Sequence, residues 1–324
     1  MNFNFQLSCE STVDLPYEYV VKRNMSVIFY SYVIDGVEYE DNMERSVEAR
    51  KKFYNLIKGG SMPSTSQINE YKYEEYFENL LKQGDVLHIT LGTGMTPSYK
   101  NACKAAEILK DKYPDRKLVI VDSLCSSGGY GLLVDYCADL RDEGKCIEEI
   151  KDWVENNCNK VHHQFFSTNL KYFRRSGRVS GPSAIVGSIL KICPLMRLNQ
   201  EGKIVAYDKV RLTKNAIKET VLTIVNNIQN GKEYDGKMFI YHSESIELAK
   251  ELEKEIIEQI PNMNGRIKML NIGNIIASHC GSGTVAVSFI GNERICDQTR
   301  KYCTCHHQEY GSTHFNFSFH IITS

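Results

Sequence analysis

The sequence predicts an α/β fold with two domains. Before residue 155, apolar strand-like runs alternate with helix-like runs, and turns rich in glycine, serine and threonine separate them. This alternation is typical of a parallel sheet that binds ligands at the carboxyl ends of its strands. Later strands are paired through a hairpin and crossed by helices, which favours a mixed sheet. We expect an N-terminal α/β domain over residues 1–157, a C-terminal α/β domain over 158–292 and an atypical tail over 293–324.

The N-terminal elements follow from residue type and spacing. An apolar run at 5–7 predicts a strand, and a turn leads to a helix near Tyr17. Asp35-Gly36 follows a β-branched and aromatic run, a pattern typical of a tight hairpin turn. Further along we expect helices over 47–57, 71–82 and 99–113, strands over 27–34, 86–91 and 117–121, and a hydroxyl-rich loop over 61–67.

The C-terminal elements are predicted in the same way. Long amphipathic runs indicate helices over 213–229 and 245–259, and small residues around Ala184 indicate a shorter helix. A turn-rich segment at 198–204 indicates a hairpin. Apolar runs indicate strands over 161–167, 192–198, 238–242, 266–270 and 285–290.

The stretch over residues 87–99 combines a strand, a hydroxyl-rich turn and the first turn of a helix. Gly92 and Gly94 allow a ligand to approach the backbone, and helix amides beside Thr93 favour an anion. The lysine of a phosphate-binding P-loop and a complete G-x-G-x-x-G are absent, so we do not expect a nucleotide. The hydroxyls also suit simple helix capping, and this alternative stays open.

Composition excludes several classes of protein. The 324 residues carry a net charge of −1, which does not suit a protein that coats nucleic acid or an acidic membrane. No apolar run approaches the roughly 20 residues that span a bilayer. The first residues lack a signal peptide, so we expect a cytoplasmic location. The 11 cysteines are scattered, which favours reduced thiols, and Cys303-Thr304-Cys305-His306-His307 lacks a second ligand pair, so we expect no metal.

Six short motifs occur in one order along the chain. Glu10–Pro16 resembles an Asp-Ser-Thr-x-Asp-Leu-Pro start, with Glu10 in place of the aspartate, and Pro63–Gln67 resembles Pro-Thr-Thr-Ser-Gln. The other motifs are Gly92–Tyr99, Asp122–Gly129, Leu170 with Gly177–Ser180, and His279–Gly283, in which Ser282 replaces a proline. Together they are similar to motifs of the DegV family, the two-domain fatty-acid-binding proteins of bacteria. The resemblance covers residues 5 to about 292.

The resemblance implies a two-domain DegV-like (EDD) fold and a carrier role. In that family, hydroxyls of two loops and a nearby histidine hold an acyl carboxylate where the domains meet. By position these residues are Thr65, Ser66, Thr93, Gly94 and His279. The implied ligand is a single long-chain fatty acid, without cofactor, metal or catalytic residue. The implied partner is a fatty acid kinase subunit, which phosphorylates the exposed carboxylate for phospholipid synthesis.

Two further groups of residues carry hypotheses about the ligand tail and the partner. Apolar residues are candidates for a tail tunnel between domains, with ordinary core packing as the alternative. These are Ile185, Val186, Ile189 and Leu190. A basic patch suits kinase docking or phosphate binding, with a solvated face as the alternative. Its residues are Lys171, Arg174, Arg175 and Arg178.

Two other classes of function stay open. A hydrolase or phosphotransferase would use Ser66 or Thr93 with His279, but the sequence lacks a Gly-x-Ser-x-Gly elbow and a clear third triad member. A sugar- or nucleotide-binding regulator would need a phosphate site, and the lysine of a phosphate loop is absent.

Overall fold

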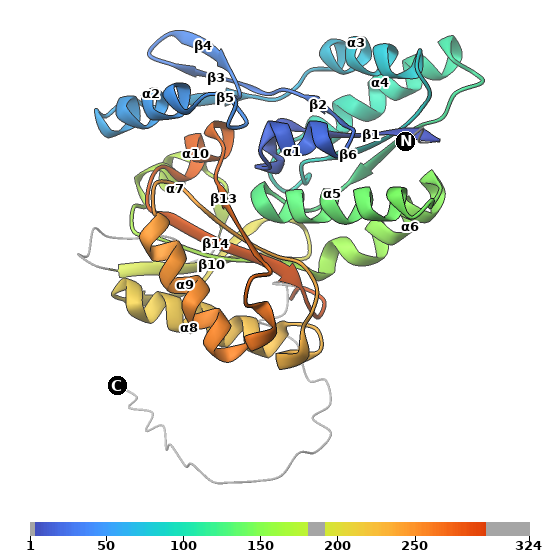
Figure 1. Ribbon diagram of the computed structural model, residues 1–324. Coiled ribbons are helices and arrows are strands. Elements are labelled where there is room, and N and C mark those ends of the chain that lie inside the picture. The colour runs from blue at the N-terminus through green and yellow to red at the C-terminus, as the bar shows by residue number, and fades with distance from the viewer. Residues whose placement is uncertain (1–3, 181–191, 296–324) are drawn as a thin grey trace, which may run out of the picture.

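The computed structural model describes residues 4–180 and 192–295 (Figure 1). The first elements are β1 (Phe5–Glu10), α1 (Tyr17–Lys22), β2 (Met25–Ile28), β3 (Ser31–Ile34), β4 (Val37–Glu40), α2 (Val47–Lys58), β5 (Ser64–Ser66), α3 (Glu70–Leu81), β6 (Asp85–Thr90), α4 (Ser98–Lys112), β7 (Leu118–Asp122), α5 (Ser127–Asp142) and α6 (Ile147–Asn157). The next are β8 (Val161–Ser167), α7 (Lys171–Ser176), β9 (Val179–Ser180), β10 (Ile192–Leu198), β11 (Ile204–Arg211), α8 (Thr213–Asn227), β12 (Met238–His242), α9 (Ile246–Gln259), β13 (Ile267–Asn271), α10 (Asn274–Cys280) and β14 (Thr284–Ile290).

Two large sheets organise these elements. The first has four parallel strands in the order β2-β1-β6-β7. The second has seven strands in the order β13-β12-β14-β8-β10-β11-β9, with antiparallel pairs in the centre and a parallel pair at each end. The predicted α/β fold with a parallel and a mixed sheet is confirmed. We propose that the domains divide between residues 157 and 158, where α6 ends.

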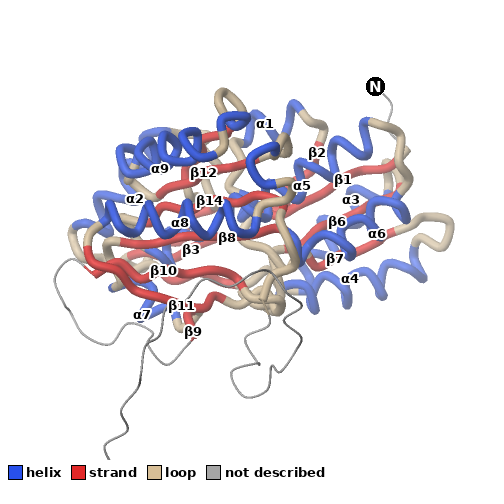
Figure 2. Tube along the Cα trace, turned by 90° about the horizontal axis from the view of Figure 1, so that it is seen from below, coloured by secondary structure: helices blue, strands red, loops and turns tan. Residues whose placement is uncertain are grey.

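The sheets stack in layers around helix α5. Helices α3 and α4 cover one face of the parallel sheet, and α5 and α6 lie between the two sheets (Figure 1). Helices α8 and α9 cover the outer face of the mixed sheet, which Figure 2 shows from below. The Tyr130 hydroxyl of α5 donates to Ile89 O of β6 at 2.5 Å, while α5 also contacts β8, β12 and β14. One helix therefore packs against both sheets.

The sequence of α5 suits a helix that is buried on all sides. Twelve of its 16 residues are buried, and they occur all round the helix instead of on one stripe. A Cβ atom at Gly128 would overlap the Tyr241 ring, and one at Gly129 would overlap the His163 ring. These glycines therefore allow the start of α5 to touch the mixed sheet.

Some predicted elements differ in the structure. The run at 27–34 forms two strands, β2 and β3, which belong to different sheets. The predicted Asp35-Gly36 turn does join β3 to antiparallel β4, with φ angles of 51° and 79°. The predicted loop at 61–67 contains strand β5, because the free edge of β3 offers it backbone partners. The helix expected near Ala184 lies outside the described residues.

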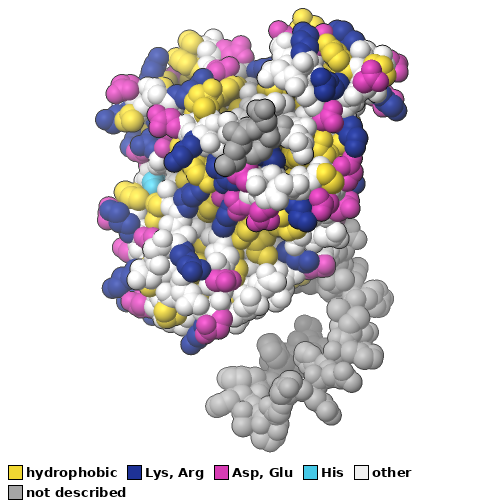
Figure 3. Space-filling model, turned by 45° about the vertical axis from the view of Figure 1, so that its right-hand side comes forward, with side chains coloured by type: hydrophobic (Ala, Val, Ile, Leu, Met, Phe, Trp, Pro, Cys, Tyr) yellow, Lys and Arg dark blue, Asp and Glu magenta, His cyan; other side chains and the backbone are white. Residues whose placement is uncertain are grey.

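The surface mixes charges of both signs on the face that Figure 3 shows. Lys and Arg side chains are interspersed there with Asp and Glu, and neither sign forms a large patch. This distribution agrees with the net charge of −1. Within residues 4–180 and 192–295, no helix has the length and apolar character required to cross a membrane.

A buried ionic cluster joins α5 to strands of the mixed sheet. Asp135 is 1% exposed and accepts hydrogen bonds from Arg23 Nη1 at 2.9 Å and Lys237 Nζ at 2.7 Å. Lys268 Nζ on β13 lies 3.8 Å from the same carboxylate. Burial by itself raises the pKa of Asp135, but Lys237 and the other partners lower it below its ordinary value. The carboxylate is therefore charged at neutral pH.

Removing this carboxylate should destabilise the protein strongly. We expect Asp135→Ala to lower the free energy of unfolding by about 1.5–3 kcal/mol, because the partly buried Arg23 and Lys237 lose charged hydrogen bonds to their one buried acceptor. Glu155 on α6 pairs with Lys151 at 2.9 Å, but its side chain is 53% exposed. Glu155→Ala should therefore cost less than about 1 kcal/mol. Urea denaturation measures both variants, and equal losses would contradict the importance of the buried cluster.

Candidate functional site

A cavity of about 400 Å³ lies between segments that are far apart in the sequence. One wall comes from β5, the residue after it and the loop before α4, and the other comes mainly from α7 and α10. The lining residues are Tyr30, Thr65, Ser66, Gln67, Leu91, Met95, Thr96, Pro97, Ser126, Phe173, Ser176, Arg178, Ile204, Ile275, Ile276, His279 and Cys280. A volume of this size is typical of sites for small organic ligands.

A smaller chamber of about 60 Å³ adjoins this cavity. The two spaces share the residues Ser126, Phe173, Ile204, Ile276 and Cys280. The chamber continues from the start of α5 to the mixed sheet, where Phe165, Tyr241 and Ala286 line it. Because its walls are mainly apolar, the combined space suits an elongated ligand with a hydrocarbon part.

Thr65 and His279 meet at a polar part of the larger cavity. A hydrogen bond of 2.8 Å joins Thr65 Oγ1 and His279 Nε2. Pairing of β5 with β3 places Thr65 opposite Tyr32, and α10 carries His279 in its last turn. Burial, together with the cations Arg178 and Arg175, lowers the pKa of His279 to about 4. The imidazole is therefore neutral at neutral pH.

The residues of the predicted basic patch have different surroundings in the structure. Arg178 lines the cavity. Arg175 Nη1 donates to Pro63 O at 3.0 Å, which ties α7 to the segment before β5. Lys171 and Arg174 are exposed on α7. Arg174, Arg175 and Arg178 are thus all exposed residues, but only Arg178 among them also lines the cavity.

Not every predicted site residue lines the cavity. Ser66 does. Thr93 does not, because its N–H and hydroxyl donate to the Asp122 carboxylate at 3.1 and 2.5 Å, at the end of the neighbouring strand β7. Gly94 also lies outside the lining and packs against the main chain of Gly202, in the turn between β10 and β11. The tail candidates Ile185, Val186, Ile189 and Leu190 lie outside the described residues.

Tyr30 and Ser126 line the cavity although the sequence did not identify them. The Tyr30 hydroxyl lies 2.8 Å from Ser98 Oγ and 3.3 Å from Glu10 Oε2, so buried polar groups hold it in place. The Ser126 N–H donates to His163 Nε2 at 3.2 Å. Ser126 belongs to one of the six motifs, so the sequence could have identified it as a site residue. Tyr30 belongs to none of these motifs, and it lies between strands of different sheets.

The described part of the chain has neither a metal-binding cluster nor a disulfide bond. Among residues 4–180 and 192–295, no group of three or more His, Cys, Asp or Glu side chains is arranged to hold a metal ion. The cysteines within these ranges are free thiols. The Cys-x-Cys-His-His segment at 303–307 lies outside them.

The layered fold defines an α/β protein with a parallel sheet, a mixed sheet and a cavity lined by segments that lie far apart in the sequence. The chain belongs to the DegV family, since the family model described as "Uncharacterised protein, DegV family" matches residues 4–292. A DegV domain-containing protein of Clostridium perfringens is 36% identical over 291 residues, which cover 90% of this chain and 98% of that protein. The family membership predicted from the motifs is confirmed.

Solved structures of similar proteins have the same fold. A fatty-acid-binding DegV family protein from Streptococcus agalactiae superposes with a TM-score of 0.76 at 24% identity, over 90% of this chain and 100% of that chain. A stearic-acid-binding protein from Eubacterium ventriosum superposes with a TM-score of 0.77 at 19% identity, over 89% of this chain and 98% of that chain.

The ionisation of His279 provides a test of the site's electrostatics. NMR titration of the histidine rings should give His279 a pKa of about 4, since burial and two cations oppose its protonation. The unfolded chain binds this proton more readily, so the stability linked to His279 is lost as pH falls from about 6.5 towards 4. Arg178→Gln should raise the pKa, while Arg174→Gln should leave it unchanged. A midpoint near 6.5 in the wild type would refute this description.

Proposed function

We propose that the protein binds one long-chain fatty acid, with the carboxylate at Thr65, His279 and Arg178 and the tail in the apolar part of the cavity. The observation that carries this proposal is the Thr65–His279 hydrogen bond beside Arg178 in a cavity of about 400 Å³ that adjoins an apolar chamber. The fatty acids bound by the related proteins from Streptococcus agalactiae and Eubacterium ventriosum support it.

The chemistry of the polar end suits a carboxylate. A hydroxyl and a guanidinium are strong donors to an anion, because hydrogen bonds that involve a charged group are stronger than neutral ones. The neutral His279 ring adds a further polar group without a charge of its own. Burial of the tail contributes about 0.8 kcal/mol per methylene, so a long chain provides most of the binding free energy.

The role of Thr65 can be tested by comparison with Thr93, a threonine outside the cavity lining. Native mass spectrometry and solvent extraction should find one fatty acid per chain. Thr65→Val should weaken binding by about 10- to 100-fold, because a charge-assisted hydrogen bond contributes about 1.5–3 kcal/mol. Thr93→Val should bind as the wild type does, since the Thr93 hydroxyl donates to Asp122. A wild-type protein that takes up no added fatty acid would overturn the proposal.

We further propose that the protein is a carrier without catalytic activity that presents the carboxylate to a fatty acid kinase. His279 pairs with Thr65, and within the described residues no carboxylate orients its ring as a catalytic triad requires. Thr93, the other candidate nucleophile, is bonded to Asp122. Ser66 is both exposed and part of the lining, so a second protein can approach the polar end from outside.

The exposed arginine of α7 provides a test of partner docking. With a purified fatty acid kinase subunit and ATP, Arg174→Glu should slow acyl-phosphate formation by about tenfold, as expected when one interface charge is reversed. Its affinity for fatty acid should not change, because Arg174 lies outside the cavity lining. Arg116→Glu, the same change at another exposed arginine, before β7, serves as the control. Equal rates for both variants would exclude this docking surface.

A further inference from the structure

Strand β7 forms one edge of the parallel sheet. Within the described part of the chain it pairs with β6 and with no other strand, and Figure 2 shows it at the end of the sheet. The Val86 N–H donates to Lys117 O at 2.8 Å, so residues 117, 119 and 121 are those that bond to β6. The backbone groups of Leu118 and Ile120, which alternate with them, therefore point to the free edge.

A groove of about 440 Å³ lies at this edge. The partly exposed residues Leu118, Val119 and Ile120 line it from β7, and Cys103 and Ala106 line it from α4. Apolar side chains thus lie next to a row of backbone groups that β6 does not use. These are the two features by which a sheet edge accepts a further strand.

Residues 315–321, which lie outside the described residues, have the sequence pattern of such a strand. Apolar and polar side chains alternate along them, which gives a strand one apolar and one polar face. The apolar residues are Phe315, Phe317, Phe319 and Ile321, and the polar ones are Asn316, Ser318 and His320. The segment contains no Asp, Glu, Lys, Arg or Pro, the residues that commonly prevent pairing at an edge.

The last described residues lie beside the carboxyl end of β7. Arg294 Nη1 donates to Leu124 O at 3.0 Å, two residues after β7, and the Arg294 N–H donates to Asn159 O at 2.8 Å. Residues 296–314 separate this point from Phe315 and can extend over about 60 Å. Strand β7 itself spans about 17 Å. The segment is therefore tethered within reach of the whole edge.

We propose that residues 315–321 bind the free edge of β7 as a fifth strand of the parallel sheet. The phenylalanines occupy the groove between β7 and α4, and the polar residues lie on the opposite face. The backbone groups of Leu118 and Ile120 gain partners, and the edge is closed to other chains. The tether favours this segment over any free partner, because its binding is intramolecular.

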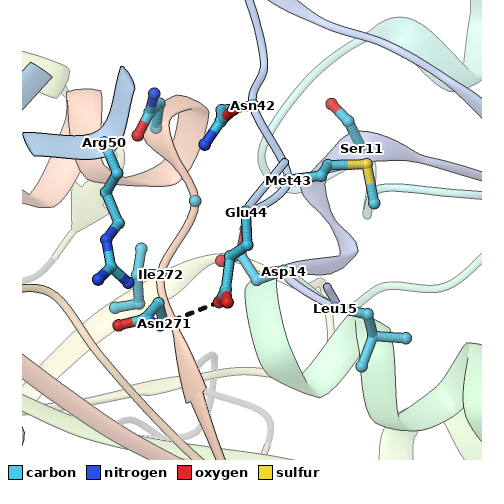
Figure 4. A pocket seen from close by; sticks show the side chains of 11 residues that line it. Ser11, Asp14, Leu15, Asn42, Met43, Glu44, Arg50, Asn271 and Ile272 are labelled. Atoms are coloured by element: carbon cyan, nitrogen blue, oxygen red, sulfur yellow. Dashed lines mark hydrogen bonds between the residues drawn. The ribbon is translucent and has the colours of Figure 1, made fainter. Parts of the chain in front are cut away.

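The added strand is not required to hold the two sheets together. Asn271 Nδ2 of β13 donates to Glu44 Oε1 of the N-terminal part at 3.0 Å, as Figure 4 shows. Lys237, the residue before β12, pairs with Asp135 of α5 at 2.7 Å. Variants of residues 315–321 should therefore fold and should bind fatty acid as the wild type does. The inference does not rest on the proposed function.

Hydrogen–deuterium exchange of the full chain, resolved for single amides by NMR, tests the inference. In the wild type, the Leu118 and Ile120 amides should exchange as slowly as that of Val119, which β6 protects. Phe317→Asn should speed exchange at Leu118 and Ile120 by about tenfold or more, because burial of a phenylalanine changes the binding constant by at least that factor. Ser318→Asn introduces the same residue on the opposite face and should change these rates by less than about threefold.

The amide of Val119 serves as the internal control, since slow exchange there shows that the variant is folded. Rapid exchange at Leu118 and Ile120 in the wild type would overturn the inference, because the edge would then be open. Slow exchange that persists in Phe317→Asn would overturn it as well. If that persistent protection weakens on dilution, a second copy of the chain occupies the edge instead of residues 315–321.

Discussion

Helix α5 is buried between the two sheets and contacts both of them. Its Tyr130 hydroxyl donates to β6 of the parallel sheet, and its first glycines allow contact with Tyr241 and His163 of the mixed sheet. Its start lines the apolar chamber, while Asp135 further along binds cations from the mixed sheet. One helix therefore determines both how the sheets meet and where the cavity lies.

The polar end of the cavity combines side chains that lie far apart in the sequence. Strand β5 presents Thr65 because β3 offers it a free edge, and Arg175 secures the preceding segment by donating to Pro63 O. Helix α10 brings His279 to the same place, in a dry environment that keeps the ring neutral. Arg178 supplies a positive charge and Thr65 a hydroxyl at this end of the cavity, whereas the His279 ring carries no charge.

The departure at Glu10 from the family pattern has a structural explanation. Glu10 is fully buried, yet its carboxylate accepts hydrogen bonds from the Tyr73 hydroxyl and from the N–H of Leu91 at 2.8 Å. The Tyr30 hydroxyl, which belongs to a cavity-lining residue, lies 3.3 Å from the same group. The longer side chain is thus satisfied by its own partners, which is the condition for burying a carboxylate.

Patterns within short segments were sufficient to predict the fold class, most strands and helices, the Asp35-Gly36 hairpin and the family. These features depend on periodicity, turn chemistry and short motifs, which are local. Contacts between distant segments explain why residues 64–66 form a strand, why Thr93 binds Asp122 and why Arg178 lines the cavity. Asp14 and Asp41 both approach Gly273, the residue before α10, for the same reason. Each of these outcomes depends on contacts between segments far apart in the chain, and no local pattern carries that information.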